Sequence, residues 1–87
     1  MFLLTNTKND VILQYGNNFM QIISIKDIGK LVKEARKKQK LTQVQLAQLS
    51  NVGTRFLSDL ENGKPTCEVE KTLKVLSNLG IRLMVQE

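Results

Sequence analysis

The sequence predicts a mainly α-helical domain that ends in one short β-strand. Between residues 24 and 80, apolar residues recur at intervals of three and four, which is the spacing of a buried helix face. Cap residues and helix stops divide this stretch into four short helices. Residues 81–87 alternate between apolar and polar side chains, which is typical of a strand. We therefore expect three parts: residues 1–23, 24–80 and 81–87.

Length and composition limit the class of protein. The 87 residues are 41% hydrophobic and 24% charged, as in a soluble domain, and a chain this short buries so little surface that a partner subunit helps to stabilise it. No apolar run approaches the roughly 18 residues of a membrane span, and the initial MFLL is too short for a signal-peptide core. Cys67 is the single cysteine, so an internal disulfide is impossible. We expect a cytoplasmic protein that does not enter a membrane.

The positive charge indicates an anionic partner. The net charge is +5, and seven of the thirteen basic residues lie between Lys26 and Lys40, where only Asp27 and Glu34 oppose them. Such a run is either a solvated helix face or a surface that meets phosphate groups. We expect these residues to divide between the two roles.

The N-terminal part carries signals of a β-hairpin. Residues 15–18, YGNN, are typical of a turn, and apolar residues alternate before it at Val11 and Leu13 and after it from Phe19. We expect residues 1–23 to form either a weak hairpin or a loosely ordered arm.

Capping signals set the limits of the first two helices. Ser24 begins SIKD, a capping box, so a helix starts there and ends near Gln39. Thr42 can cap a second helix that stops at NVG, residues 51–53. The side chains expected inside are Ile25, Ile28, Leu31, Val32 and Ala35 from the first helix, and Leu46, Ala47 and Leu49 from the second.

Two further helices follow. One runs from about Thr54 to Asn62 and is stopped by Gly63. Thr66 can cap the other, which Gly80 terminates. The side chains expected inside are Leu57 and Leu60 from the third helix, with Val52 before it, and Val69, Leu73, Leu76 and Leu79 from the fourth.

The final strand needs a partner. Ile81, Leu83 and Val85 share one face of it and require a place to be buried. The partner is either the N-terminal arm or the same strand of a second subunit, and antiparallel self-pairing is naturally two-fold symmetric. We take a homodimer that pairs through these residues as the working prediction.

The second and third helices have the features of a helix-turn-helix. Both are short, a tight turn joins them, and the small Ala47 permits their close approach. The second helix of such a motif enters the major groove of DNA with its N-terminal end, so we expect the polar start of the third helix to lie there. Thr54, Arg55 and Asp59 lie on one side of it, and Gln43 begins the second helix, where a DNA phosphate binds favourably.

These residues resemble a known family. LTQVQLAQLSNVGTRFLSDLENGK, residues 41–64, resembles the helix-turn-helix domain of phage repressors and of bacterial regulators of the xenobiotic-response-element type. GTRFLSDLENGKPT with the later LGIRL is similar to HipB-like antitoxins, over residues 24–86. The narrower resemblance implies a dimer that binds palindromic double-stranded operator DNA, represses its own operon and neutralises a HipA-like serine/threonine kinase toxin.

The resemblance also implies roles for particular residues. It places Gln43 on phosphate, Thr54 and Arg55 on bases, and Ser58 and Asp59 beside them, with Gly53 where relatives cap the helix with serine or threonine. In this fold the residue that follows the helix stop, Lys64, meets phosphate. The DNA-binding set is thus Gln43, Gly53, Thr54, Arg55, Ser58, Asp59 and Lys64.

Several of these residues also have a purely structural interpretation. Arg55 is otherwise an ordinary surface arginine, and Asp59 positions its neighbours rather than reading a base. Phe56 belongs to the core rather than to a thymine methyl contact. Glu61 needs a basic partner in the first helix or nearby.

Other classes of function have less support. The chain has no histidine, one cysteine and no glycine-rich phosphate loop, so we expect no enzyme, metal or cofactor. A protein-binding module without DNA is disfavoured by the basic first helix. The main alternative to the antitoxin is a standalone phage-type or bacterial repressor without a toxin partner.

Overall fold

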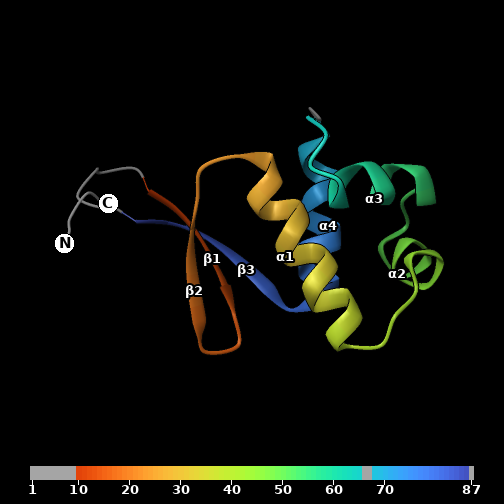
Figure 1. The fold of residues 1–87 in the computed structure, drawn as a ribbon, viewed down its shortest axis with the longest axis horizontal. Helices are drawn as coiled ribbons and strands as arrows, with labels where there is room; N and C mark the ends of the chain where they lie inside the picture. Colours follow the sequence, from red (N-terminus) through yellow and green to blue (C-terminus); the bar gives the residue numbers. More distant parts are fainter. Residues whose placement is uncertain (1–9, 66–67, 87) are drawn as a thin grey trace.

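The computed structural model describes residues 10–65 and 68–86, which form four helices and three strands (Figure 1). A β-hairpin precedes the helices and the third strand follows them. In chain order the elements are β1 (Asp10–Tyr15), β2 (Asn18–Ile22), α1 (Ile25–Lys38), α2 (Gln43–Ser50), α3 (Thr54–Glu61), α4 (Val69–Leu79) and β3 (Ile81–Gln86).

The three strands form one antiparallel sheet in the order β2-β1-β3. Leu13 in the central strand lies opposite Met20 on one side and Leu83 on the other. Of the two forms expected for residues 1–23, the described part adopts the hairpin, and its turn uses Gly16 with φ 61°. Residues 1–9 lie outside the described part of the chain.

β3 therefore pairs within its own chain. Of the two partners expected for the final strand, the structure contains the N-terminal one, β1, in register from Asp10 opposite Gln86 to Tyr15 opposite Ile81. The mainly helical prediction holds for the four helices, but the working prediction paired the final strand across a dimer, whereas β3 lies in a three-stranded sheet with β1 and β2 of its own chain. β3 is an edge strand of that sheet.

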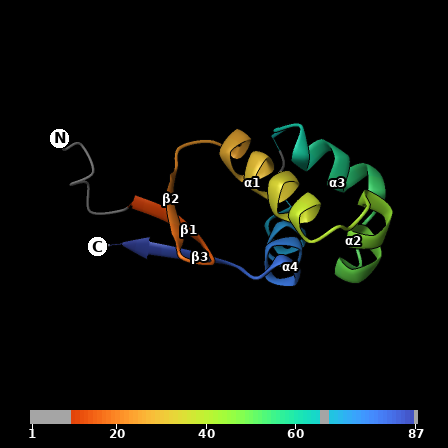
Figure 2. The same ribbon diagram turned by 60° about the horizontal axis from the view of Figure 1, so that its bottom comes forward.

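The sheet and the helices lie side by side. Figures 1 and 2 show the sheet at one end of the long axis and the helices at the other, with β3 continuing directly from α4. Gly80, with φ 77°, caps α4 in the left-handed conformation and turns the chain into β3, as expected.

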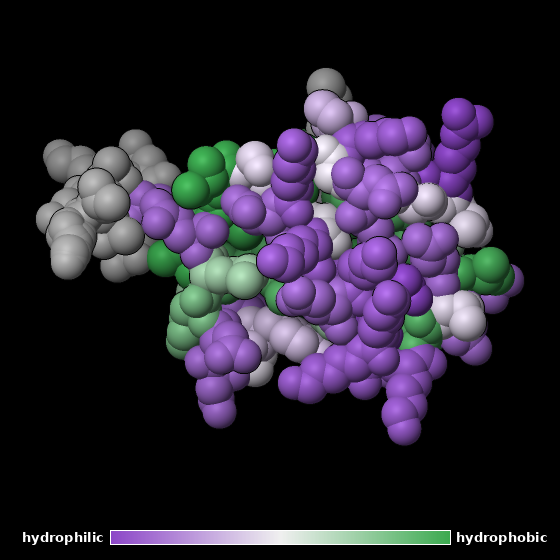
Figure 3. Space-filling view, in the orientation of Figure 1, coloured by the Kyte–Doolittle hydropathy of each residue, from purple (hydrophilic) through white to green (hydrophobic). Residues whose placement is uncertain are grey.

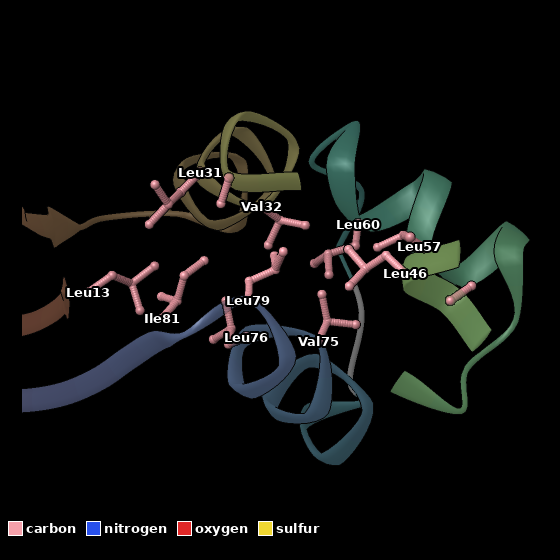
Figure 4. Close-up of a cluster of buried hydrophobic side chains, with 12 residues drawn as sticks. Leu13, Leu31, Val32, Leu46, Leu57, Leu60, Val75, Leu76, Leu79 and Ile81 are labelled. Carbon is pink, nitrogen blue, oxygen red and sulfur yellow. The ribbon is translucent and has the colours of Figure 1, made fainter. Parts of the chain in front are cut away.

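The core joins the two parts. Leu13 from β1 and Ile81 from β3 point toward Leu31, Leu76 and Leu79 of the helices (Figure 4). The buried cluster consists of Leu13, Leu31, Val32, Ala35, Leu46, Ala47, Leu57, Leu60, Val75, Leu76, Leu79 and Ile81.

Three expected core residues are instead exposed: Leu49, Val69 and Leu73. In α2 the buried arc runs through Leu46, Ala47 and Ser50, and Leu49 falls outside it. In α4 the buried arc is centred on Thr72, Val75, Leu76 and Leu79, which leaves Val69 and Leu73 on its edge. The spacing of apolar residues at three and four positions predicted these helices correctly. In helices this short, however, the spacing located the centre of the buried face only to within one residue.

α1, α2 and α3 start where the sequence predicts. Ser24 and Thr42 each form a full capping box, with Asp27 and Gln45 as the reciprocal side chains. α4 begins after Glu68, which makes no side-chain capping bond. The capping role expected for Thr66 lies outside the described residues.

Candidate nucleic-acid interface

The turn between α2 and α3 is short because Asn51 adopts the left-handed conformation, with φ 55°. Asparagine tolerates this conformation better than most residues. The N–H of Val52 then donates to the carbonyl of Ala47, and Gly53 starts α3 without a side-chain capping bond. Ala47 is buried beside this turn, which is the close approach expected of a helix-turn-helix.

α1 holds the end of α3 through a glycine. A Cβ atom at Gly29 would collide with the backbone carbonyl oxygen of Leu60, so the two helices touch backbone to backbone. Our sequence reading missed this contact, although a glycine inside a helical pattern is the signal that marks close packing.

A polar cluster of three side chains lies beside that contact. Arg36 Nε and Nη2 donate to the two carboxylate oxygens of Glu61, at 2.7 and 3.1 Å, and Gln43 Nε2 donates to Glu61 Oε1 at 3.0 Å. Arg36 Nη1 also donates to the carbonyl of Leu41, at 2.8 Å. The basic partner expected for Glu61 is thus confirmed as Arg36 of the first helix.

Gln43 was predicted to bind phosphate, but its side chain also makes a hydrogen bond within the protein. Its side-chain amide is part-buried and fixed on Glu61. The amide nitrogen of glutamine carries two hydrogens, so one N–H remains beyond the bond to Glu61. Because Gln43 is the first residue of α2, its backbone N–H also points out of the helix start.

The exposed face of α3 contains the predicted base readers. Thr54 and Arg55 are exposed, whereas Ser58 and Asp59 are half-buried further along the helix. Leu57 and Leu60 lie on the opposite, buried side. Phe56 is half-buried and packs against the core, and Lys71 Nζ lies 5.6 Å from the centre of its ring.

Lys64 follows the end of α3 and pairs with Asp59. Lys64 Nζ is 3.3 Å from Asp59 Oδ1, and the two side chains are 64% and 40% exposed. An ion pair this exposed contributes little stability and is easily exchanged for another partner. The pair brings two of the predicted DNA-binding residues together at the C-terminal end of α3.

The predicted dimerisation residues have different environments. Ile81 is buried in the core of its own chain, with 4% of its surface exposed. Leu83 and Val85 are 45% and 60% exposed on the same face of the strand. Only these two of the three leave apolar surface for a partner.

The described residues contain neither a metal-binding cluster nor a membrane-spanning helix. In residues 10–65 and 68–86, no group of three or more Cys, Asp or Glu side chains is arranged to hold a metal ion. Among the helices described, none is long and apolar enough to span a membrane.

The fold and this site define a helix-turn-helix protein. The chain belongs to the helix-turn-helix family, whose model matches residues 32–84, and members of this family are DNA-binding transcription regulators. It is 54% identical over 54 residues to the uncharacterized HTH-type transcriptional regulator y4mF of Sinorhizobium fredii, an alignment that covers 62% of this chain and 71% of that one.

Two other similarities extend this result. The immunity repressor protein of Bacillus phage phi105 is 36% identical over 56 residues, covering 64% of this chain but 39% of the repressor. The crystal structure of the restriction-modification controller protein C.AhdI from Aeromonas hydrophila superposes with a TM-score of 0.60 at 26% identity, covering 67% of this chain and 88% of that one.

Proposed function

We propose that the protein is a sequence-specific transcriptional repressor that binds a palindromic operator as a homodimer. The observation that carries this proposal is the exposed polar face of α3, presented at a helix-turn-helix and held in place by the bonds of Glu61 to Arg36 and Gln43. A recognition helix enters the major groove with its N-terminal residues against base edges.

The proposed contacts divide into two kinds. Arg55 and Thr54, at the start of α3, read base edges, and Ser58 and Asp59 lie beside them. Gln43 at the start of α2, Gly53 through its backbone N–H, and Lys64 after α3 bind phosphates and set the orientation of the domain.

The proposed dimer uses the free edge of β3. Leu83 and Val85 are exposed there, and Ile81 anchors the strand to the core. Pairing of β3 with its symmetry mate would bury both side chains and join two three-stranded sheets. Residues 24–80 then bind DNA, and residues 81–87 form the dimer contact.

The finer proposal is that the repressor is an antitoxin. The similarity of residues 24–86 to HipB-like antitoxins supports a cytoplasmic protein that represses its own operon and neutralises a HipA-like kinase toxin. A standalone repressor is the second candidate, and the similarity to a phage immunity repressor favours it.

Base reading is tested by comparing Arg55→Ala with Lys64→Ala. Arg55→Ala should weaken operator binding by about 1–3 kcal/mol and binding to random duplex much less. Lys64→Ala should weaken both duplexes equally and lower the slope of log affinity against log salt by about one per lost contact. Equal weakening of both duplexes by Arg55→Ala would exclude base reading by that residue.

The antitoxin role is tested by co-expression. The protein and the product of the adjacent gene should co-purify, and kinase activity of that product should fall in the complex. If the neighbouring gene encodes no kinase, or if a kinase encoded there does not co-purify, the standalone repressor is the correct reading.

A further inference from the structure

The lysines of α1 fall on two different sides of the helix. At 3.6 residues per turn, Lys26, Lys30, Lys33 and Lys37 lie within an arc of about 60°. All four are exposed. We call them the lysine stripe. Lys38 lies well away from this arc, and its Nζ is 5.8 Å from the centre of the Tyr15 ring in the hairpin.

The lysine stripe borders the contact between α1 and α3. Gly29 and Arg36, which meet Leu60 and Glu61, occupy the adjacent arc of α1. At one end of the stripe, a Cβ on Gly63 would lie 2.8 Å from Cγ of Lys26. The stripe therefore begins beside the end of α3 and runs along α1 toward the start of α2.

The stripe and the proposed reading face share one side of the α1–α3 contact. On α1, the core residues Val32 and Ala35 lie on the opposite side of Arg36 from the stripe. On α3, Leu57 and Leu60 likewise lie on the opposite side of Glu61 from Arg55 and Ser58. In Figure 3 most of the side chains seen over the helices are hydrophilic, with a few neutral or hydrophobic ones among them.

The lysine stripe carries four positive charges, of which that of Lys30 interacts with the carboxylate of Asp27. Among the ion pairs between described residues, none includes Lys26, Lys30, Lys33 or Lys37. The nearest buried carboxylate, Glu61, is already bound by Arg36 and Gln43. Four exposed cations in one row, on the same side of the α1–α3 contact as the reading face, match the regular negative charge of a DNA strand.

We propose that the lysine stripe binds the phosphate backbone of duplex DNA beside the bases contacted by α3. This inference rests on the proposed DNA binding and extends it to α1. Contacts of this kind carry no sequence information, so the stripe adds affinity and salt dependence without adding discrimination.

The test compares two double variants of equal charge. Lys33→Gln with Lys37→Gln removes two stripe lysines, and Lys38→Gln with Lys74→Gln removes two exposed lysines elsewhere. Footprinting first locates the operator, and affinities for the operator and for random duplex of the same length are then measured over a salt series. The stripe variant should lower the salt slope by about 0.9 per lost phosphate contact, or roughly three to four per dimer, on both duplexes.

The ratio of operator to random affinity should stay unchanged in the stripe variant, and the control variant should keep the wild-type slope. Equal slopes for the two double variants would overturn the proposal and identify the stripe as a solvated helix face. If α3 does not read bases, Arg55→Ala weakens binding to operator and to random duplex equally. In that case the salt slope measured on random duplex still decides whether the stripe binds DNA.

Discussion

Arg36 and Glu61 form a buried ion pair that fixes the last turn of α3 against α1. Arg36 Nε lies 2.7 Å from Glu61 Oε2, and the side chains are 10% and 2% exposed. Because Gln43 bonds to the same carboxylate, the pair also positions the start of α2. One carboxylate thus orients both helices of the helix-turn-helix relative to α1.

Glu61→Ala should destabilise the protein by about 3–5 kcal/mol, since it leaves the Arg36 guanidinium buried without its partner. Urea unfolding followed by circular dichroism measures the loss. Arg36→Met combined with Glu61→Leu should recover much of it, because apolar side chains replace both charges. A loss below about 1 kcal/mol for the single variant would show that the pair contributes little.

Ionisation of Asp27 should make the free energy of unfolding depend on pH under acidic conditions. Hydrogen bonds from the backbone N–H groups of Ile23 and Ser24 lower the pKa of its carboxyl below the ordinary 3.8, and Lys30 adds a smaller effect. Because the folded pKa is the lower one, the stabilisation is complete above the unfolded pKa and is lost as pH falls through the folded pKa.

The free energy of unfolding of wild type minus that of Asp27→Asn should therefore be constant from about pH 5 upward and should shrink below about pH 4. Glu34→Gln removes one negative charge from an exposed site of the same helix and serves as the control. A difference that stays constant down to pH 2.5 would contradict the capping role of the carboxylate.

Local signals predicted more of this fold than long-range ones. The caps at Ser24 and Thr42 and the stop at Gly80 depend on neighbouring residues, and all were located correctly from the sequence. The pairing of β3 with β1 joins Ile81 to Tyr15 across 66 positions, and the alternating pattern does not specify which strand lies opposite. Both partners were consistent with the residues, and symmetry favoured a second subunit, whereas β3 pairs with β1 of its own chain.

In the candidate site, too, the features that depend on local sequence were predicted and those that depend on packing were not. The exposed start of α3 followed from helix periodicity, but the bonds from Arg36 and Gln43 to Glu61 depend on how three helices pack. Arg36 was read only as one of seven basic residues, because charge alone does not distinguish a buried arginine from its exposed neighbours.

Gly29→Ala should destabilise the protein although alanine is the better helix former. The substitution gains about 1 kcal/mol of helix propensity, but its Cβ collides with the Leu60 carbonyl oxygen and forces α1 and α3 apart. We expect a net loss of about 1–3 kcal/mol in thermal unfolding. Lys33→Ala, at an exposed site one turn later, should change stability by less than about 0.5 kcal/mol. Unchanged or raised stability of Gly29→Ala would contradict the backbone contact.

Leu83→Lys should disrupt the proposed dimer while leaving the monomer folded, because Leu83 is 45% exposed and lies on the edge strand. Sedimentation velocity should show a shift toward monomer, and operator binding should weaken with it. Phe19→Lys, at a residue of β2 that is 61% exposed, is the control and should remain dimeric. If the Leu83→Lys variant sediments as an unchanged dimer, the interface lies elsewhere.

Lys40→Gly should stabilise the protein. Lys40 follows the C-cap Gln39 of α1 and has φ 61°, a conformation that costs a residue with a Cβ atom about 1–2 kcal/mol and glycine almost nothing. Part of this gain is offset because glycine makes the unfolded chain more flexible, so we expect a net gain of about 0.5–1 kcal/mol. Lys40→Ala removes the same charge but keeps the backbone cost, and it should be no more stable than wild type. Urea midpoints at equal m-values compare the three proteins. If Lys40→Gly unfolds at the same midpoint as Lys40→Ala, the left-handed residue at the end of α1 imposes no strain, and the turn into α2 is determined by the bond from Arg36 to the Leu41 carbonyl instead.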